Sequence, residues 1–257
     1  MSTLSTSTDG RVMTVALHRP EARNAFNAAM IAELYETFTH LPDTLRAIVL
    51  TGAGSAFCAG ADVHWMRDSI QRTEEENRQD AARMEAMFRA IDECPVPVIG
   101  RVMGPALGGG MGLIAACDIV IATPDAQFGY TEVRLGIVPA VISPFSLAKI
   151  GERSARRYFL TGEIFDAATA HTIGLVHEVV TPDQLDGRVR AVIDALLKNG
   201  PHAVRTAKEL IRRVTRLSRD EAREYTIATI ARARISAEGQ DGLTAFLEKR
   251  KPRWLSE

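Results

Sequence analysis

PVIGRVMGPALGGGMGLIAACDIVIA, residues 97–122, carries four glycines within five positions between two apolar runs. The first run predicts a strand, the small-residue stretch after the glycines predicts a helix, and residues 118–122 predict another strand. Glycine at a strand-to-helix joint lets backbone N–H groups approach a ligand that a Cβ would keep away. The start of a helix adds unpaired donors and partial positive charge. The stretch therefore predicts a place that holds a negatively charged oxygen.

The pattern along the rest of the chain predicts two parts. Short apolar strands alternate with amphipathic helices up to residue 181, and the pattern from residue 182 onward is helical. This order indicates an α/β core, residues 1–181, and a helical region, residues 182–257, that covers the core or supplies a subunit interface. The expected strands are residues 12–18, 46–51, 98–102, 118–122 and 176–180, and the expected helices are residues 27–41, 73–93, 183–198, 201–217, 218–236 and 238–249.

Composition argues against several classes of protein. A formal net charge of −1 gives no whole-chain reason to expect nucleic-acid or membrane binding. No apolar run approaches the roughly 18–20 residues that span a bilayer, and the first residues lack a signal pattern. Cys58, Cys94 and Cys117 are widely spaced, which predicts neither a disulfide framework nor a zinc site. We expect a cytoplasmic protein without a metal.

A second loop, GAGSAFCAGAD at residues 52–62, also follows an expected strand. Its first glycines suggest a dinucleotide-binding motif, but Phe57 stands where the third glycine would be. The later glycine run lacks the Lys-Ser/Thr ending of a P-loop, which disfavours ATP or GTP. Each loop alone is also compatible with an ordinary tight turn between a strand and a helix.

Taken together, the two loops resemble the motif segments of the crotonase superfamily, the enoyl-CoA hydratases and isomerases. The matching segments are SAFCAGAD at 55–62 and GPALGGGMGLIAACDIVIA at 104–122, with RPEARNAFN at 19–27, FGYTEVRLGIVPA at 128–140 and TGEIFDAATAHTIGLVHEVV at 161–180. The resemblance covers nearly the whole chain in order. It implies a spiral core of ββα units, a helical C-terminal region that builds trimers, often paired into hexamers, and an acyl-CoA thioester substrate. It implies no separate cofactor, because CoA is part of the substrate.

The resemblance also implies an oxyanion hole formed by the two loops. Matched by motif position, its donors are the backbone N–H groups of Ala59 and Gly109, while Gly60, Ala61 and Asp62 contact the acyl-CoA. A thioester enolate carries negative charge on its oxygen, and two fixed donors stabilise that charge more than they stabilise the ground-state carbonyl. Backbone donors would explain why small residues occupy both loops.

The same resemblance gives Glu132, in YTEVRLG, the role of general acid/base. Hydration needs water activated for attack at the β-carbon and a proton delivered to the α-carbon. An apolar pocket that raised the pKa of this carboxyl would suit both tasks. In the family pattern a second glutamate shares the work, but this chain has Gly112 at that position.

The missing glutamate leaves three interpretations open. The protein is a hydratase in which one glutamate, aided by water or by the substrate's own carboxylate, handles the protons. Alternatively, it is an enoyl-CoA isomerase, which needs one base to move a proton between carbons. The third interpretation is a non-catalytic homologue that binds acyl-CoA or RNA.

The segments GLIAACDIVIA at 112–122 and TEVRLGIVPAVISPF at 131–145 are similar to those of bacterial hydratases of 3-methylglutaconyl-CoA and isohexenylglutaconyl-CoA. These are branched substrates from leucine and acyclic-terpene breakdown. The position of the first glutamate is often small in that branch. Both substrates carry a free carboxylate, so we expect a cation in the acyl pocket, with Arg134 and His64 as candidates.

Three residues are candidates for binding the CoA end. Arg23 lies in the segment where the family commonly places a basic residue near the nucleotide, and Phe246 and Lys249 match residues that reach the adenine and phosphate. Residues 205–234 hold nine Lys/Arg against four Asp/Glu. Aromatic residues are scarce among them, so we expect a solvated and interfacial helix face rather than an RNA-binding surface.

Overall fold

The structure, a computed structural model, describes residues 2–255 apart from the side chain of Ser69. The chain forms two compact units: the residues up to Cys94 with Val98–Val189, and Pro95–Pro97 with the residues from Arg190 onward. The sequence pattern predicts a boundary at residues 181/182, whereas the two units divide inside helix α7 (Pro182–Leu197). The first half of α7 belongs to the first unit because Leu185 and Val189 are buried there.

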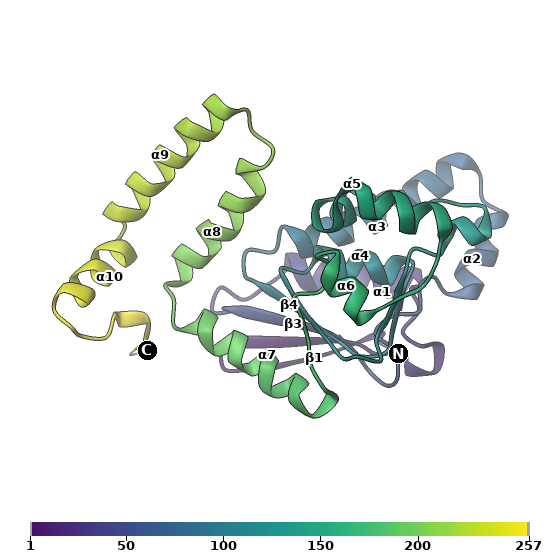
Figure 1. Ribbon diagram of the computed structural model, residues 1–257, viewed down its shortest axis with the longest axis horizontal. Helices are drawn as coiled ribbons and strands as arrows, with labels where there is room; N and C mark the ends of the chain where they lie inside the picture. The colour runs from purple at the N-terminus through teal and green to yellow at the C-terminus, as the bar shows by residue number, and fades with distance from the viewer. Residues whose placement is uncertain (1, 256–257) are drawn as a thin grey trace. The chain divides into compact units, whose positions relative to one another are not determined.

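A six-stranded sheet forms the base of the first unit (Figure 1). Its strand order is β1-β2-β3-β4-β6-β9, with β1 antiparallel to β2 and every other pair parallel. The strands are β1 (Leu4–Asp9), β2 (Val12–Leu17), β3 (Ala47–Gly52), β4 (Val98–Val102), β6 (Ile119–Ala122) and β9 (Glu178–Val179). The central strands β3 and β4 are almost wholly buried, which is why they read as unbroken apolar runs.

A second, three-stranded sheet takes part in a strand–strand–helix path that the chain follows twice. It consists of β5 (Pro105–Leu107), β7 (Gln127–Gly129) and β8 (Phe165–Asp166). The chain passes from β4 in the large sheet to β5 in the small one and then into helix α4, and it repeats this path through β6, β7 and α5. The expected spiral of ββα units is confirmed.

Helices of the first unit pack in a series, α1 on α3, α3 on α4 and α4 on α5. Their bounds are α1 (Ala28–Thr39), α2 (Val63–Ile70), α3 (Glu74–Asp92), α4 (Gly109–Ala116), α5 (Ser143–Thr161) and α6 (Ala167–Thr172), with short 3₁₀ helices η1 (Pro20–Ala22) and η2 (Glu132–Leu135). The side chain of Asn27 accepts from the amide of Met30 at 2.9 Å, which confirms Asn27 as the predicted N-cap of α1.

The sequence pattern missed β1, the helices α2, α5 and α6, and most of the shorter elements. β1 has the sequence LSTSTD, and all of its side chains after Leu4 are exposed. Its backbone pairs with β2 at the edge of the sheet, so an apolar alternation is not required. The two-residue strand β8 depends on pairing with the distant strand β7 and leaves little local signal, whereas β9 lies inside the expected strand of residues 176–180.

The second unit is helical, as predicted. Its helices are α8 (Pro201–Val214), α9 (Arg219–Ile235) and α10 (Ala237–Leu247), followed by the short helix η3 (Arg253–Leu255). Glu238 joins α10 to the start of α8, because its carboxylate accepts from the amides of His202 and Ala203 at 2.9 and 2.8 Å. Many large apolar side chains of this unit are exposed, namely Ile211, Ile227, Ile230, Ile235, Leu243, Phe246 and Leu247.

Candidate active site

Two loops that are far apart in the sequence meet at the start of α4. Cys58 forms a parallel bridge with Ala106: its amide donates to the carbonyl of Pro105 at 3.1 Å, and its carbonyl accepts from the amide of Leu107 at 2.9 Å. A Cβ at Gly110 would lie only 2.6 Å from the carbonyl oxygen of Cys58. The glycine run therefore permits the close backbone approach that the sequence predicted.

The amide of Ala59 is already used within the chain. It donates to the carbonyl of Arg23 at 3.0 Å. A donor occupied in this way is not available to a substrate oxygen, so the assignment of Ala59 to the oxyanion hole is wrong. The error arose because motif position alone does not show which way each amide points.

Ala61 provides the available amide in this loop. Its neighbours Gly60 and Asp62 pair with Phe26, whose amide donates to the Gly60 carbonyl at 2.8 Å and whose carbonyl accepts from the Asp62 amide at 2.7 Å. In a parallel bridge of this kind, the central residue directs its own N–H away from the partner strand. No hydrogen bond among residues 2–255 uses the amide of Ala61.

The first turn of α4 supplies further donors. A helix leaves its first amides without intrahelical partners, and none of the hydrogen bonds in the described part of the chain uses the amide of Gly109 or Gly110. Gly108 precedes them with φ 51°, a value that favours glycine, and its amide donates to the carbonyl of Gly129 at 2.9 Å. A Cβ at Gly109 would lie 2.7 Å from the Phe26 ring, so this ring fixes the helix start.

The carboxylate of Glu132 lies next to both loops. Glu132 begins η2, and a Cβ at Gly108 would lie 3.6 Å from its Oε1 and 3.7 Å from the Cα of Gly60. Burial raises the pKa of Glu132 above its ordinary value of 4.5. Its Oε2 is buried and has no hydrogen-bond partner among residues 2–255. A carboxyl with a raised pKa beside backbone donors is suited to proton transfer.

Apolar side chains close the position of the missing second glutamate. A Cβ at Gly112 would lie 2.5 Å from Cγ2 of Ile142 and 2.7 Å from the Phe88 ring. The Phe88 ring packs edge-on against Phe26, with centroids 6.1 Å apart, and in a tilted arrangement against Phe145, with centroids 6.0 Å apart. Neither Ile142 nor Phe88 carries a proton-transfer group, so this part of the site offers no substitute for the carboxylate.

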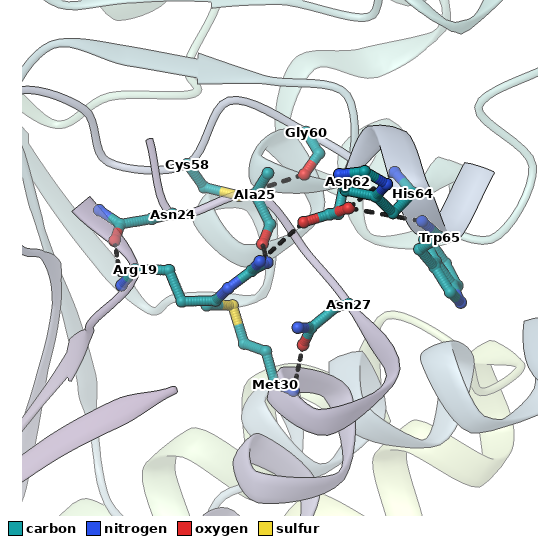
Figure 2. A network of polar contacts seen from close by, with 10 residues as sticks. All are labelled: Arg19, Asn24, Ala25, Asn27, Met30, Cys58, Gly60, Asp62, His64 and Trp65. Atoms are coloured by element: carbon teal, nitrogen blue, oxygen red, sulfur yellow. Dashed lines mark hydrogen bonds and ion pairs between the residues drawn. The ribbon is translucent and has the colours of Figure 1, made fainter. Parts of the chain in front are cut away.

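An ion pair fixes the loop that contains Ala61 (Figure 2). Arg19 Nη2 lies 2.7 Å from Asp62 Oδ2, while Asp62 Oδ1 accepts from the amide of His64 at 2.8 Å and more distantly from that of Trp65. Burial alone would raise the pKa of Asp62, but the Arg19 guanidinium and these two amides hold it below its usual value. Because both of its oxygens are occupied, Asp62 serves as a positioning residue rather than as the expected substrate contact.

Asn24 completes this scaffold. Its side-chain oxygen accepts from the amide of Arg19 at 2.9 Å, and its Nδ2 donates to the carbonyls of Ala53 and Ala56, both at 2.8 Å. Asn24 is fully buried and has φ 55°, a conformation that asparagine tolerates better than most residues. Arg19, Asn24 and Phe26 are site residues that the sequence pattern did not indicate one by one. All three lie in the RPEARNAFN segment, and their place in that motif was the available signal.

The remaining predicted residues lie at varying distance from this centre. His64 is exposed in the first turn of α2, and Arg134 is exposed in η2, two residues beyond Glu132. The side chain of Arg23 is exposed, and its backbone carbonyl accepts the hydrogen bond from the Ala59 amide. Phe246, which is 82% exposed, and Lys249 belong to the second unit, so their contact with CoA stays a prediction.

Four further features of residues 2–255 concern the cysteines, metal ligands, membrane-spanning helices and a cavity. The three cysteines are buried and form no disulfide with one another, and burial raises the pKa of the Cys58 thiol to about 12. No cluster of three His, Cys, Asp or Glu side chains in this range could hold a metal ion. None of the described helices has the length and apolar character needed to cross a membrane. A cavity of about 380 Å³ between α1 and α3 shares no residue with the loops described above.

Similarity to known proteins agrees with this geometry. A family model described as enoyl-CoA hydratase/isomerase matches residues 7–257. A putative enoyl-CoA hydratase of Thermus thermophilus is 34% identical over 249 residues, covering 95% of this chain and 98% of that protein. The short-chain-enoyl-CoA hydratase of Clostridium acetobutylicum is 33% identical, covering 95% and 94%.

Solved structures resemble the fold throughout its length. An enoyl-CoA hydratase from Shewanella pealeana superposes with a TM-score of 0.95 at 39% identity, covering 98% of this chain and 96% of that one. The Pseudomonas aeruginosa protein AtuE gives a TM-score of 0.95 at 35% identity, covering 98% and 99%. Both similarities span the α/β core and the helical C-terminal region.

Proposed function

The chain belongs to the enoyl-CoA hydratase/isomerase family, and from this membership we propose that it adds water across the 2,3 double bond of an enoyl-CoA thioester. The observation that carries the proposal is the position of Glu132 Oε1, 3.6 Å from where a Cβ at Gly108 would stand. This position supports a proton-transfer role for Glu132, because its carboxylate lies beside the loop whose amides can hold an anion.

The proposed oxyanion donors are the amides of Ala61 and Gly109. As water attacks C3, the electrons of the double bond move toward C2 and the thioester carbonyl, and negative charge develops on that oxygen. Two fixed amides stabilise this charge, and loss of one such donor typically costs about 2.7–4 kcal/mol of barrier. The use of both amides elsewhere in the chain would weaken the proposal, but neither is used among residues 2–255.

Glu132 handles the proton at both ends of the double bond. It accepts a proton from water as the C3–O bond forms, and it returns that proton to C2 as the enolate collapses to the thioester. One carboxyl can perform both steps in sequence, because it regains its charge at the end of the cycle. A mechanism with one carboxylate is supported by the packing at Gly112, because Ile142 and Phe88 fill the space in which a side chain at this position would lie.

For the substrate we propose a branched acyl group with a free carboxylate, of the 3-methylglutaconyl or isohexenylglutaconyl type. Arg134 supports this class because it lies two residues from Glu132 on η2 and is exposed. An arginine there could pair with a carboxylate on the acyl chain. His64 and the CoA contacts Arg23, Phe246 and Lys249 remain part of the proposal, as does the cytoplasmic location expected from the sequence.

An isomerase is the second candidate, favoured by the single carboxylate of the site. One assay in ¹⁸O-labelled water distinguishes hydration from isomerisation. Its substrates are crotonyl-CoA, 3-methylglutaconyl-CoA, isohexenylglutaconyl-CoA and a 3-enoyl-CoA. A hydratase incorporates one labelled oxygen into a 3-hydroxyacyl product, and our substrate proposal expects the highest kcat/KM with a carboxylate-bearing thioester. Double-bond migration without label identifies an isomerase. Binding without any product identifies a non-catalytic homologue.

Glu132→Gln tests the catalytic role directly. We expect turnover to fall by about 10²–10⁴-fold with acyl-CoA affinity nearly unchanged, since Gln keeps the shape but accepts no proton. Glu152→Gln is the matched control, because Glu152 is an exposed carboxylate on α5 paired with Arg156. Full turnover in the Glu132 variant would remove the assigned role.

We also propose a homotrimer or a dimer of trimers built by the second unit. The exposed apolar side chains of α8, α9 and α10 support an interface there, since monomers rarely expose so many together. Light scattering coupled to size exclusion measures the mass, and Ile230→Glu with Ile235→Glu should dissociate the assembly. A monomeric wild-type protein would contradict this proposal.

A further inference from the structure

The imidazole of His177 is hydrogen-bonded to the backbone of a neighbouring strand. His177 directly precedes β9, the last strand in the order of the large sheet. Its Nδ1 accepts from the amide of Val120 in β6 at 3.0 Å, and its own amide donates to the Val120 carbonyl at 2.9 Å. The ring therefore takes the place of the backbone carbonyl that would accept from Val120 if β9 were longer.

This contact determines the protonation state of the ring. A backbone N–H can only donate, so Nδ1 must present its lone pair and the imidazole of His177 must be neutral. Protonation would place a second donor in front of the Val120 amide, which removes the hydrogen bond and leaves two N–H groups facing each other. His177 is exposed, so a proton reaches the ring without unfolding of the chain.

His171, in the last turn of α6, has the opposite kind of partner. Its Nδ1 lies 3.0 Å from the carbonyl oxygen of Val176, which can only accept. Nδ1 of His171 therefore carries the proton, and protonation of its other ring nitrogen leaves this hydrogen bond intact. The two histidines should consequently respond differently to acid.

The charged surroundings of His177 also favour the neutral ring. The titratable groups that face it are Lys149 of α5, His171 of α6, Asp118 just before β6 and Glu178 of β9. Partial burial of the ring, and then the charge of Lys149, lower the pKa of His177 below its ordinary value of 6.5, while Glu178 and Asp118 oppose this shift. Both carboxylates are held elsewhere, since Asp118 accepts from the amide of Val98 at 2.7 Å and Glu178 pairs with Arg188.

We propose that His177 is a pH-sensitive latch, which holds β9 in the sheet while its ring is neutral and releases β9 when the ring is protonated. β9 is paired with β6 over two residues, with Ile121 opposite Glu178 and Ala122 opposite Val179. Because this pairing is so short, the hydrogen bond between His177 and Val120 is a substantial part of the attachment.

Release of β9 should also loosen the beginning of α7. Glu178 of β9 forms an ion pair with Arg188 of α7, and the distance from Arg188 Nη2 to Glu178 Oε1 is 2.7 Å. The stability that the latch contributes is present above the ordinary pKa of 6.5 and is lost as the pH falls through the lower pKa of the folded state. The latch therefore weakens, in mild acid, the stretch of chain that leads into the second unit.

Hydrogen exchange of the intact wild-type protein tests the latch. Mass spectrometry follows peptides that cover residues 118–123 and 176–190 at pH 7.5 and pH 5.5, with exchange corrected for the intrinsic rates. We expect local opening of these peptides to increase by about 3–10-fold at the lower pH, as loss of one hydrogen bond implies. Peptides from β2 and β3 should be unchanged. Equal protection of residues 118–123 and 176–190 at both pH values would overturn the proposal.

Three variants assign the effect to one ring. His177→Asn keeps an acceptor, because its Oδ1 can stand where Nδ1 stood, but it does not titrate, so the peptides should stay protected at both pH values. His177→Leu has no acceptor and should open them at both. His171→Asn is the matched control and should follow wild type. Acid-induced opening that persists in His177→Asn, or that disappears in His171→Asn, would refute the latch.

Nitrogen-15 NMR of labelled histidine shows directly where the protons lie in the wild-type protein. At neutral pH we expect Nδ1 to be unprotonated in His177 and protonated in His171. A proton on Nδ1 of His177 would refute the latch even if the His177 variants fold poorly. These measurements do not use turnover, so their outcome is independent of the proposed function.

Discussion

The edge of the Phe88 ring lies against Gly112, in the space that any side chain at this position would need. A Cβ there would stand 2.7 Å from Cε1 and Cζ of Phe88 and 2.5 Å from Ile142. The ring is fully buried and wedged between Phe26 and Phe145, so it has little freedom to move aside. Glycine is therefore required by the packing around α4, and the second carboxylate of the family pattern could not be added without rebuilding this part of the core.

Gly112→Glu should consequently destabilise the protein without improving it as a catalyst. Overpacking and a buried, unpaired carboxylate together should cost about 3 kcal/mol or more. Thermal or denaturant unfolding measures this loss, and hydration of 3-methylglutaconyl-CoA measures activity. A stable variant with faster turnover would show that the site can use two carboxylates.

The control for this variant is Gly187→Glu. Gly187 also lies within a helix, α7, but a Cβ there would meet no atom within 4 Å. The same chemical change in open space should leave stability within about 0.5 kcal/mol and leave activity unchanged. A similar loss of stability in both variants would mean that the added charged side chain, rather than the contact with Phe88, causes the loss.

Local patterns in the sequence predicted much of this architecture. The strand–glycine–helix order of residues 97–122, the Asn27 cap and the helical C-terminal region all follow from short-range chemistry, and the structure has each of them. Glu132 was located through a motif, and its raised pKa fits the apolar surroundings that its neighbours in the sequence suggested.

The rest depends on contacts between distant segments. Whether Ala59 or Ala61 offers its amide is decided by pairing with the segment around Phe26, which no spacing within the loop reveals. The space at Gly112 is closed by Phe88 and by Ile142, each more than twenty residues away in the sequence. Only the folded arrangement shows these contacts.

Phe26 joins both loops, and its ring should therefore matter for catalysis. Its backbone pairs with Gly60 and Asp62, while its ring lies where a Cβ at Gly109 would come within 2.7 Å. In Phe26→Leu the backbone pairing persists but the support for the Gly109 amide is reduced. We expect kcat to fall about 10-fold with a modest change in KM, because a displaced oxyanion donor weakens transition-state binding most.

Phe38→Leu separates this effect from general core damage. Phe38 is also buried, on α1, and it contributes nothing to the two loops. Both substitutions should lower the free energy of unfolding by about 1–2 kcal/mol, but only Phe26→Leu should lower kcat. Equal kcat in the two variants would argue against a role for the Phe26 ring in holding Gly109.

The Arg19–Asp62 ion pair should be a large contributor to stability. Both side chains are largely buried, at 19% and 10% exposure, so removing one partner leaves the other charge without its counterpart. Asp62→Asn should cost about 3 kcal/mol at neutral pH. The pKa of Asp62 is lowered in the folded state, so its contribution is present above the unfolded pKa and fades as the pH falls through the folded one. The gap between wild type and Asp62→Asn should therefore narrow in acid.

Asp186→Asn provides the comparison for an exposed pair. Asp186 lies 2.6 Å from Arg101, but its side chain is 78% exposed, so its loss should cost at most about 1 kcal/mol. A double-mutant cycle with Arg19→Gln and Asp62→Asn should give less than the sum of the single losses. Additive losses would show that Arg19 and Asp62 act independently.

Glu132 should make the wild-type protein less stable as the pH rises. Its pKa is raised in the folded state because burial disfavours the charged form, so the folded protein binds a proton more tightly than the unfolded chain does. The stability that this carboxyl contributes is fully present below its ordinary pKa of 4.5 and is lost as the pH rises through the pKa of the folded state.

Glu132→Gln carries no such charge and should melt at a higher temperature than wild type at pH 7–8, with a difference that shrinks toward pH 5. Glu152→Gln, at an exposed position, should show no such trend. Melting curves that stay parallel across this pH range would mean that Glu132 is as well solvated in the fold as in the unfolded chain, and the acid/base role would lose its physical basis.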